Sequence, residues 1–110
     1  MANIKNKFGQ YMTPKKVANF MFSLSSANTS SRILEPSCGD GVFLEEIKKG
    51  DYKYNSVIAI EFDEIEANKS ENIKLANSTI INTDFHKYCI NTNRKFDLII
   101  GNPPYIRYQY

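Results

Sequence analysis

Features of several common protein classes are missing from this chain of 110 residues. No apolar run approaches the roughly 20 residues that a membrane-spanning helix needs, and the first residues lack the apolar core of a signal peptide. The two cysteines, Cys38 and Cys89, lie far apart and fit neither a metal-binding nor a CxxC spacing. We therefore expect a cytoplasmic protein with two reduced thiols, no bound metal ion and no membrane partner.

A strong excess of charge is also missing, because the net charge is only +2. That value alone neither favours nor excludes a nucleic-acid partner. A mild basic cluster near the start is most simply a solvated face, with phosphate contact as the alternative; it contains Lys5, Lys7, Lys15 and Lys16. The single histidine, His86, is interpreted as a surface residue. A hydrophobic content of 42% and a charged content of 24% are ordinary for one globular domain.

The hydrophobic pattern predicts helices that alternate with strands. Thr13 and Pro14 favour a helix start, and apolar residues follow at helical spacing; these are Val17, Phe20, Met21 and Leu24. Buried strands are expected at residues 32–36, 56–62, 78–82 and 96–101. Further helices are expected at residues 42–49 and 63–75, the first of them ending at Gly50. This order predicts a parallel, three-layer α/β sheet.

A glycine-containing turn follows the first expected strand, at the edge where parallel sheets bind ligands. Gly39 and Gly41 permit unusual backbone dihedrals and let the backbone approach a ligand closely. Leu44 stands where a dinucleotide fingerprint would have its third glycine, which disfavours a nicotinamide cofactor. Glu61 ends the second expected strand, where a carboxylate can accept hydrogen bonds from both ribose hydroxyls. The alternative for Glu61 is a solvated strand end.

Asp84 and Phe85 follow the third expected strand. A carboxylate there can accept from an exocyclic amine, and an aromatic ring can pack on an adenine face. The alternative is that Asp84 caps a helix and Phe85 packs in the core.

The segment 102–105, Asn-Pro-Pro-Tyr, follows the fourth expected strand. Pro103 and Pro104 fix two φ angles and remove two donors, which leaves the Asn102 side-chain oxygen and the Pro103 carbonyl as acceptors. Two acceptors on an amino group localise the lone pair of a poor nucleophile, and the methyl group must then be held in line with it. Tyr105 can stack on a planar substrate, worth about 1–3 kcal/mol for a base. The alternative is a proline-rich turn that closes the strand.

Together these segments resemble the gamma-class N6-adenine DNA methyltransferases of restriction–modification systems, over nearly the whole chain. The matching stretches are residues 8–14 (FGQYMTP), 34–44 (LEPSCGDGVFL), 59–63 (AIEFD), 83–85 (TDF) and 102–105 (NPPY). The resemblance implies the Rossmann-like class I methyltransferase fold, represented here by its first four parallel strands with flanking helices. Residues 1–30 would form an N-terminal segment and helix, and residues 31–110 the cofactor-binding half through the NPPY motif.

The resemblance also implies S-adenosylmethionine as cofactor and DNA as partner, with methyl transfer to the N6 amino group of a flipped adenine. The methionine part of the cofactor would be contacted by Tyr11, Thr13 and Pro14. Its amino end and sulfonium region would be held by Glu35, Pro36, Ser37, Cys38, Gly39 and Gly41. Its adenosine part would be bound by Glu61 at the ribose and by Phe62, Asp84 and Phe85 at the adenine. The target amine would be gripped by Asn102, which also borders the cofactor, and by Pro103 and Pro104, with Tyr105 stacked on the flipped base.

The NPPY motif does not single out DNA, because enzymes that methylate a protein glutamine or RNA carry it too. The stretch FGQYMTP, joined to the Glu-Pro-Ser-Cys-Gly turn, favours DNA. Two alternatives stay open: a methyltransferase acting on RNA or on a protein glutamine amide, and a non-catalytic cofactor-binding module.

Proteins of this family continue after NPPY with three more strands and a target-recognition domain. We therefore expect residue 110 to be the boundary of a longer chain. We also expect the 110-residue chain alone to be inactive on DNA, and the fourth strand to be an exposed edge through which it self-associates.

Overall fold

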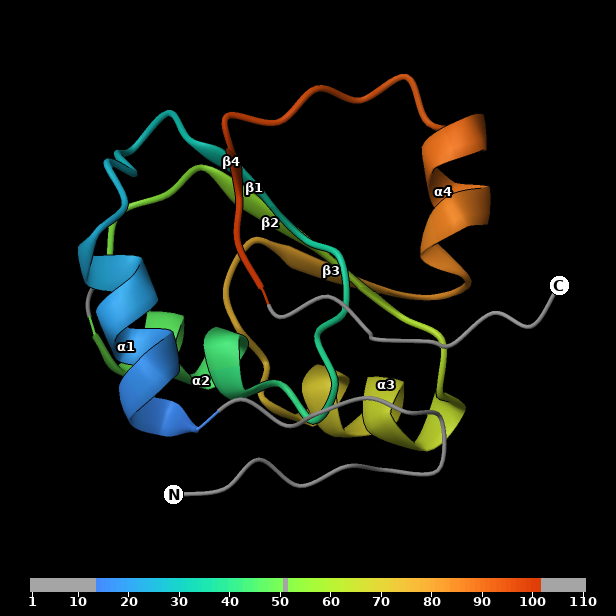
Figure 1. Ribbon diagram of the computed structural model, residues 1–110, viewed down its shortest axis with the longest axis horizontal. Coiled ribbons are helices and arrows are strands. Elements are labelled where there is room, and N and C mark those ends of the chain that lie inside the picture. Colours follow the sequence, from blue (N-terminus) through green and yellow to red (C-terminus); the bar gives the residue numbers. More distant parts are fainter. Residues whose placement is uncertain (1–13, 51, 102–110) are drawn as a thin grey trace, which may run out of the picture.

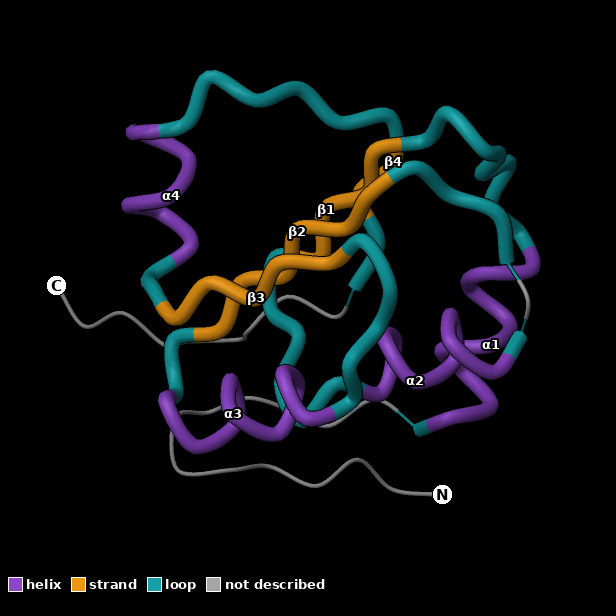
Figure 2. The backbone as a smooth tube through the Cα atoms, turned by 180° about the vertical axis from the view of Figure 1, so that it is seen from behind, coloured by secondary structure: helices purple, strands orange, loops and turns teal. Residues whose placement is uncertain are grey.

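The computed structural model describes residues 14–50 and 52–101. These residues form helices α1 (Lys15–Ser23), α2 (Val42–Lys49), α3 (Glu64–Asn72) and α4 (Phe85–Asn91). They also form strands β1 (Arg32–Glu35), β2 (Ser56–Glu61), β3 (Ser78–Asn82) and β4 (Leu98–Ile99). The strands are all parallel, in the order β3-β2-β1-β4. Helices α1, α2 and α3 lie together on one side of the sheet and α4 lies on the other (Figures 1 and 2). The expected three-layer α/β arrangement is confirmed.

The two faces of the sheet explain why β2 reads as one continuous apolar run. Successive side chains of a strand point to opposite faces. Val57 and Ala59 join the larger hydrophobic cluster, which contains side chains of α1 and α2, whereas Ile58 and Ile60 join the smaller cluster on the side of α4. A strand covered on both faces needs apolar residues at every position.

Helix α1 begins at Lys15, so Pro14 is its extended N-cap and not part of the first helical turn as expected. Its buried face also differs from the apolar residues that predicted it. Val17 is 45% exposed, Phe20 62% and Leu24 71%, while Ala18 and Phe22 are buried. Phe22 packs against Tyr52, with ring centroids 4.6 Å apart. Ala18 is part of the larger cluster although its side chain is small and only weakly hydrophobic, so hydrophobicity alone did not predict the buried face.

Helix α4 was not predicted. It has only seven residues and none is fully buried, so its apolar residues are too few for a clear helical pattern. Asp84 caps it, because Asp84 Oδ1 accepts from His86 N at 2.6 Å and from Lys87 N at 3.4 Å. Phe85 packs against the smaller cluster. In this structure, the two residues therefore have the cap and packing roles that were weighed as alternatives.

The predicted bounds differ most from the structure at α3 and β4. Helix α3 ends at Asn72 and not at residue 75, because Lys74 adopts a left-handed conformation with φ 55°. Leu75 instead turns back into the larger cluster. Strand β4 is shorter than residues 96–101, with only Leu98 and Ile99 paired as strand.

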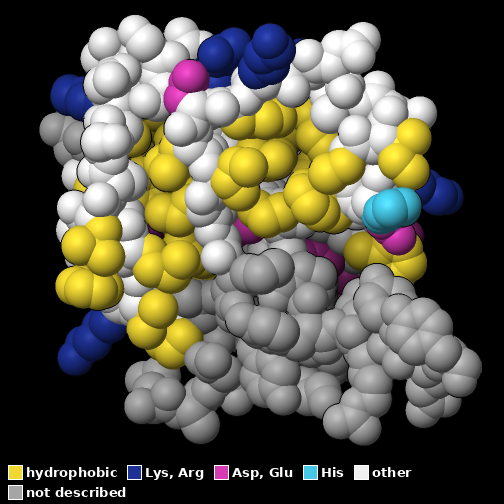
Figure 3. All heavy atoms as spheres, turned by 45° about the horizontal axis from the view of Figure 1, so that its top comes forward, with side chains coloured by type: hydrophobic (Ala, Val, Ile, Leu, Met, Phe, Trp, Pro, Cys, Tyr) yellow, Lys and Arg dark blue, Asp and Glu magenta, His cyan; other side chains and the backbone are white. Residues whose placement is uncertain are grey.

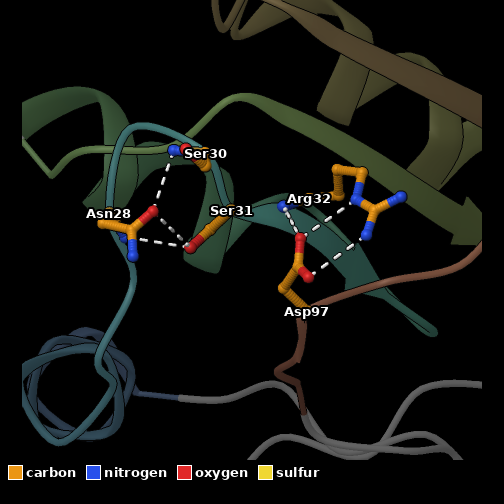
Figure 4. A network of polar contacts seen from close by, with 5 residues as sticks. All are labelled: Asn28, Ser30, Ser31, Arg32 and Asp97. Atoms are coloured by element: carbon orange, nitrogen blue, oxygen red, sulfur yellow. Dashed lines mark hydrogen bonds and ion pairs between the residues drawn. The ribbon is translucent and has the colours of Figure 1, made fainter.

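A polar clamp fastens β4 to β1 at their amino ends (Figure 4). Asp97 Oδ2 accepts from Arg32 N at 2.8 Å and from Arg32 Nε at 3.0 Å, and Oδ1 accepts from Nη2 at 3.2 Å. Hydrogen bonds from Arg32 hold the pKa of the Asp97 carboxyl below its usual range. Beside the clamp, Asn28 Oδ1 accepts from Ser30 N at 2.8 Å and closes the turn before β1. The clamp fixes where the short strand β4 begins.

Among the described residues, β4 pairs only with β1, so its outer edge has no strand partner. The side of the sheet that carries α4 is partly open, and Figure 3 shows hydrophobic side chains gathered on this side of the molecule. Ile99 of β4 is 63% exposed, although it is large and apolar. An edge with unpaired donors and acceptors beside exposed apolar side chains favours association with another chain.

We predict that the 110-residue chain self-associates or is only marginally stable. Sedimentation velocity over a range of concentrations should show an average mass that rises with concentration. Ile99→Lys, which places a charge on the exposed edge strand, should shift the chain toward monomer. A wild-type chain that stays a stable monomer at all concentrations would contradict the prediction.

Candidate functional site

The carboxyl ends of the parallel strands bring the predicted site residues to one edge of the sheet. Glu35 ends β1 and Glu61 ends β2. Asp84 follows β3, and Gly101 follows β4. In open parallel sheets this edge is where ligands bind.

The glycine turn between β1 and α2 has the dihedrals that its sequence requires. Gly39 has φ 54° and Gly41 has φ 96°, values that favour glycine. Cys38 N donates to Ile60 O at 2.8 Å, which holds the turn against β2, and Gly41 N donates to Cys38 O at 2.8 Å. A Cβ atom on Gly41 would overlap Ile73 Cδ1. Gly41 therefore serves both the turn and its close packing against the end of α3.

Ser70 of α3 supports this turn, which the sequence did not predict. Its buried hydroxyl donates to Gly39 O at 2.9 Å and lies 3.3 Å from Cys38 Sγ. Burial raises the pKa of the Cys38 thiol to about 12, so this thiol is neutral. Both cysteines of the chain are free, as expected. A serine inside a charged helix gives no sequence signal of this contact.

Glu61 is 1% exposed, so the alternative of a solvated strand end is wrong. Its Oε1 accepts from Gly39 N at 2.8 Å and its Oε2 accepts from Asp63 N at 2.8 Å. The Asp63 side chain in turn caps α3 by accepting from Ile65 N at 2.9 Å. The Glu61 carboxylate thus connects the glycine turn to the start of α3. Each carboxylate oxygen can accept more than one hydrogen bond, so ribose binding stays a prediction compatible with this geometry.

Asn82, the last residue of β3, fixes the backbone beside Glu61. Its Nδ2 donates to Glu61 O and to Phe62 O, both at 2.9 Å. Phe62 follows the strand and is 58% exposed at this edge. An exposed aromatic ring on a fixed backbone is suited to a planar ligand. Asn82 was missed because a polar residue at a strand end is common.

Glu35 is the least compensated group of the site. It is 1% exposed, its Oε1 accepts from Ser37 N at 2.8 Å, and its Oε2 has no hydrogen-bond partner among the described residues. Burial, which outweighs the hydrogen bond from Ser37 N, raises the pKa of Glu35 to about 8, with a smaller contribution from the nearby Glu61. An unpartnered buried carboxyl oxygen is costly, and a positively charged ligand or a donor would compensate it.

Some of the remaining predicted residues lie in the described part of the chain, and the others lie outside it. Pro36 and Ser37 are half-buried in the turn, and Pro14 precedes α1 as its cap position. Asp84 and Phe85 are half-buried at the start of α4, and His86 is exposed as expected. The residues that lie outside the described part of the chain are Tyr11, Thr13, Asn102, Pro103, Pro104 and Tyr105.

Within residues 14–50 and 52–101, no group of three or more His, Cys, Asp or Glu side chains could hold a metal ion. None of the helices in those ranges is long and apolar enough to cross a membrane.

The sequence is similar to methyltransferases of restriction–modification systems. Residues 5–110 match the family model described as Eco57I restriction-modification methylase. The chain is 37% identical over 97 residues to the type II methyltransferase M.CvrRI of Paramecium bursaria Chlorella virus XZ-6E, covering 88% of this chain and 24% of that protein. It is 30% identical over 105 residues to M.HincII of Haemophilus influenzae, covering 96% and 18%. The chain therefore spans a quarter or less of the length of these two relatives.

Solved structures are similar in fold. TrmN from Thermus thermophilus aligns with a TM-score of 0.68 and 21% identity, covering 82% of this chain and 28% of that chain. The plantazolicin methyltransferase BamL, solved in complex with SAH, aligns with a TM-score of 0.55 and 12% identity, covering 77% and 32%. At these identities the likeness shows the fold alone, and it confirms the expected Rossmann-like architecture.

We predict that Gly41→Ala opens the turn and destabilises the chain. A non-glycine residue in a left-handed conformation costs about 1–2 kcal/mol, and the crowding against Ile73 Cδ1 adds about 1–3 kcal/mol. Urea denaturation measures the loss. The same substitution is then made in an Ile73→Ala background. There, Gly41→Ala should lower the free energy of unfolding only by the smaller cost of the left-handed conformation. An equal loss in both backgrounds would mean that Ile73 does not crowd position 41.

Proposed function

The chain belongs to the Eco57I restriction-modification methylase family, and we propose on this basis that it forms the cofactor-binding part of a cytoplasmic DNA methyltransferase. The proposed reaction transfers a methyl group from S-adenosylmethionine to the N6 amino group of a flipped adenine in DNA. Residues 1–30 would be the N-terminal segment and helix of the catalytic domain, and residues 31–110 its cofactor-binding half.

One observation carries the proposal: two fully buried carboxyl groups, Glu35 and Glu61, end adjacent strands beside a glycine turn. An uncompensated carboxylate in such a place favours a ligand that brings positive charge. S-adenosylmethionine carries an ammonium group and a sulfonium centre, both positive. The SAH bound to BamL, a structure of similar fold, is the product that remains when this cofactor has lost its methyl group. Both points support S-adenosylmethionine as the ligand.

The cofactor would lie along the carboxyl edge from β1 to β3. Its charged end would meet Glu35, whose Oε2 has no partner among the described residues. The ribose hydroxyls would donate to Glu61, and the adenine ring would pack on the exposed Phe62 ring. Asp84 would accept from the adenine amine, because its cap bonds to α4 use only Oδ1. Phe85 would border the adenine edge.

The target amine would bind to the segment that follows β4. Gly101 lies directly before Asn102, and its backbone lies against the Glu35 carboxyl. Asn102 and Pro103 would accept the two amine hydrogens, and Tyr105 would stack on the base. When bound, the cofactor would supply the methyl group for a new N–C bond, and the C–S electron pair would leave with sulfur as a neutral thioether. The nitrogen would then lose its extra proton to solvent.

Adenine as the target rests on the resemblance of the NPPY and FGQYMTP segments. Transfer of labelled methyl groups by the complete polypeptide tests the target. Label at adenine N6 in DNA would support the proposal, whereas label in RNA or in protein glutamine would replace it. The absence of any transfer despite cofactor binding would favour a non-catalytic module.

We predict that the 110-residue chain binds S-adenosylmethionine and that Asp84→Asn weakens the binding by about 1–3 kcal/mol, the cost of leaving a buried group unsatisfied. Asn keeps the Oδ1 acceptor that caps α4 but presents an amide donor to the adenine amine. Isothermal titration calorimetry measures the affinity, and an unchanged melting temperature checks the cap. Glu61→Ala should abolish binding, with a loss of stability because Glu61 also holds the turn. Equal affinity for Asp84→Asn and wild type would remove Asp84 from the site.

We also predict that cofactor binding releases a proton. The pKa of Glu35 is about 4.5 in the unfolded chain, and burial raises it to about 8 in the folded chain. Between these pH values the folded chain binds the extra proton, so the free energy of unfolding falls as the pH rises from 4.5 to about 8. A positive ligand group favours the carboxylate and lowers its pKa, which expels the proton.

Calorimetry at about pH 6.5, in two buffers of different ionisation enthalpy, measures the released proton. Wild type should release close to one proton, and Glu35→Gln should release none and bind more weakly. Glu35→Gln should also show a smaller fall of stability with pH. Identical proton release by the two proteins would assign the titration to another group.

A further inference from the structure

Gly101 stands at the junction between β4 and the segment 102–105. Strands β1 and β4 run parallel, with Leu34 opposite Ile99. Ile100 N donates to Leu34 O at 3.0 Å, so the pairing continues past the end of β4. This register brings Gly101 alongside the Glu35 side chain.

No space for a side chain exists at position 101. A Cβ atom there would overlap Glu35 Oε1 and would lie 2.8 Å from Glu35 Cδ and 3.1 Å from Oε2. All three contacts are with one carboxyl group, so the absence of a side chain at position 101 leaves room for Glu35, and the φ of 158° is a second reason for a glycine there. Glu35 has little freedom to move away, because it is buried and its Oε1 holds Ser37 N at 2.8 Å. A side chain at position 101 must therefore turn the carboxyl group or displace the backbone before Asn102.

We propose that Gly101 is a positioning residue, which acts by leaving room for the Glu35 carboxyl to face the positively charged end of the cofactor. The inference rests on the proposed function and adds a residue to it. Gly101 itself need not contact the cofactor or the target base.

The test is the affinity of the 110-residue chain for S-adenosylmethionine, measured by calorimetry for Gly101→Ala. We expect a loss of about tenfold or more, since the carboxyl group is turned away from the ligand. Gly50→Ala is the matched control, because a Cβ at Gly50 would be crowded in the same way, 2.8 Å from Tyr52 Cδ2 and 2.9 Å from Glu46 O, at the far end of α2. The control should change stability but leave affinity as in wild type. An unchanged affinity of Gly101→Ala would overturn the inference.

A double-mutant cycle separates positioning from a merely structural effect. Glu35→Ala removes the carboxyl group, so adding Gly101→Ala to it should cause no further loss of affinity. A full additional loss would mean that Gly101 acts through another contact and would overturn the inference. If Gly101→Ala does not fold, Glu35→Asp decides, since the shorter side chain withdraws from position 101. Equal affinity of Glu35→Asp with and without Gly101→Ala supports the inference, and a persistent tenfold difference overturns it.

Failure of the proposed function looks different in the same experiment. A wild-type chain that binds no cofactor, or a Glu35→Ala chain that binds as well as wild type, removes the proposed site and the inference with it. Binding that depends on Glu35 but not on Gly101 leaves the site in place and removes only the inference.

Discussion

The carboxylate of Glu61 holds together the carboxyl edge of the sheet. Its two oxygens accept from Gly39 N and Asp63 N, so one buried group fixes the turn before α2 and the loop before α3. Asn82 Nδ2 then donates to the backbone carbonyls of Glu61 and Phe62, at the end of β2. The adjacent strands β1, β2 and β3 are thereby joined at their carboxyl ends by hydrogen bonds that involve Glu61 and Phe62. A site built on rigid strand ends keeps its geometry before a ligand arrives.

Glu35 and Glu61 show how the same residue type performs two tasks at one edge. Glu61 has both oxygens engaged by backbone donors, which stabilises the fold. Glu35 is equally buried but has an oxygen without a partner among the described residues, which destabilises the free chain. Local instability of this kind is common where a protein must bind a ligand, because the ligand restores what the fold leaves uncompensated.

The sequence was most informative where a local pattern decides the structure. Helix α2 begins after Gly41 and ends at Lys49 as predicted, because a glycine turn precedes it and Gly50 stops it. Strand β3 also has its predicted bounds. Helix α4 was missed because it is short and makes no fully buried contact, and the buried face of α1 was wrong because packing, not hydrophobicity, selects Ala18. Ser70 and Gly101 act through contacts with residues distant in sequence, so nothing in their local sequence indicates their roles.

The position of β4 in the sheet has a consequence for the order of folding. Strand β4 pairs with β1, and the clamp between Arg32 and Asp97 joins residues 65 positions apart, whereas β1 and β2 are joined by one short helical connection. Contacts between distant residues form late because the intervening loop must first be closed. During synthesis on the ribosome, strands β1, β2 and β3, which end at Glu35, Glu61 and Asn82, can therefore assemble before β4 has left the exit tunnel.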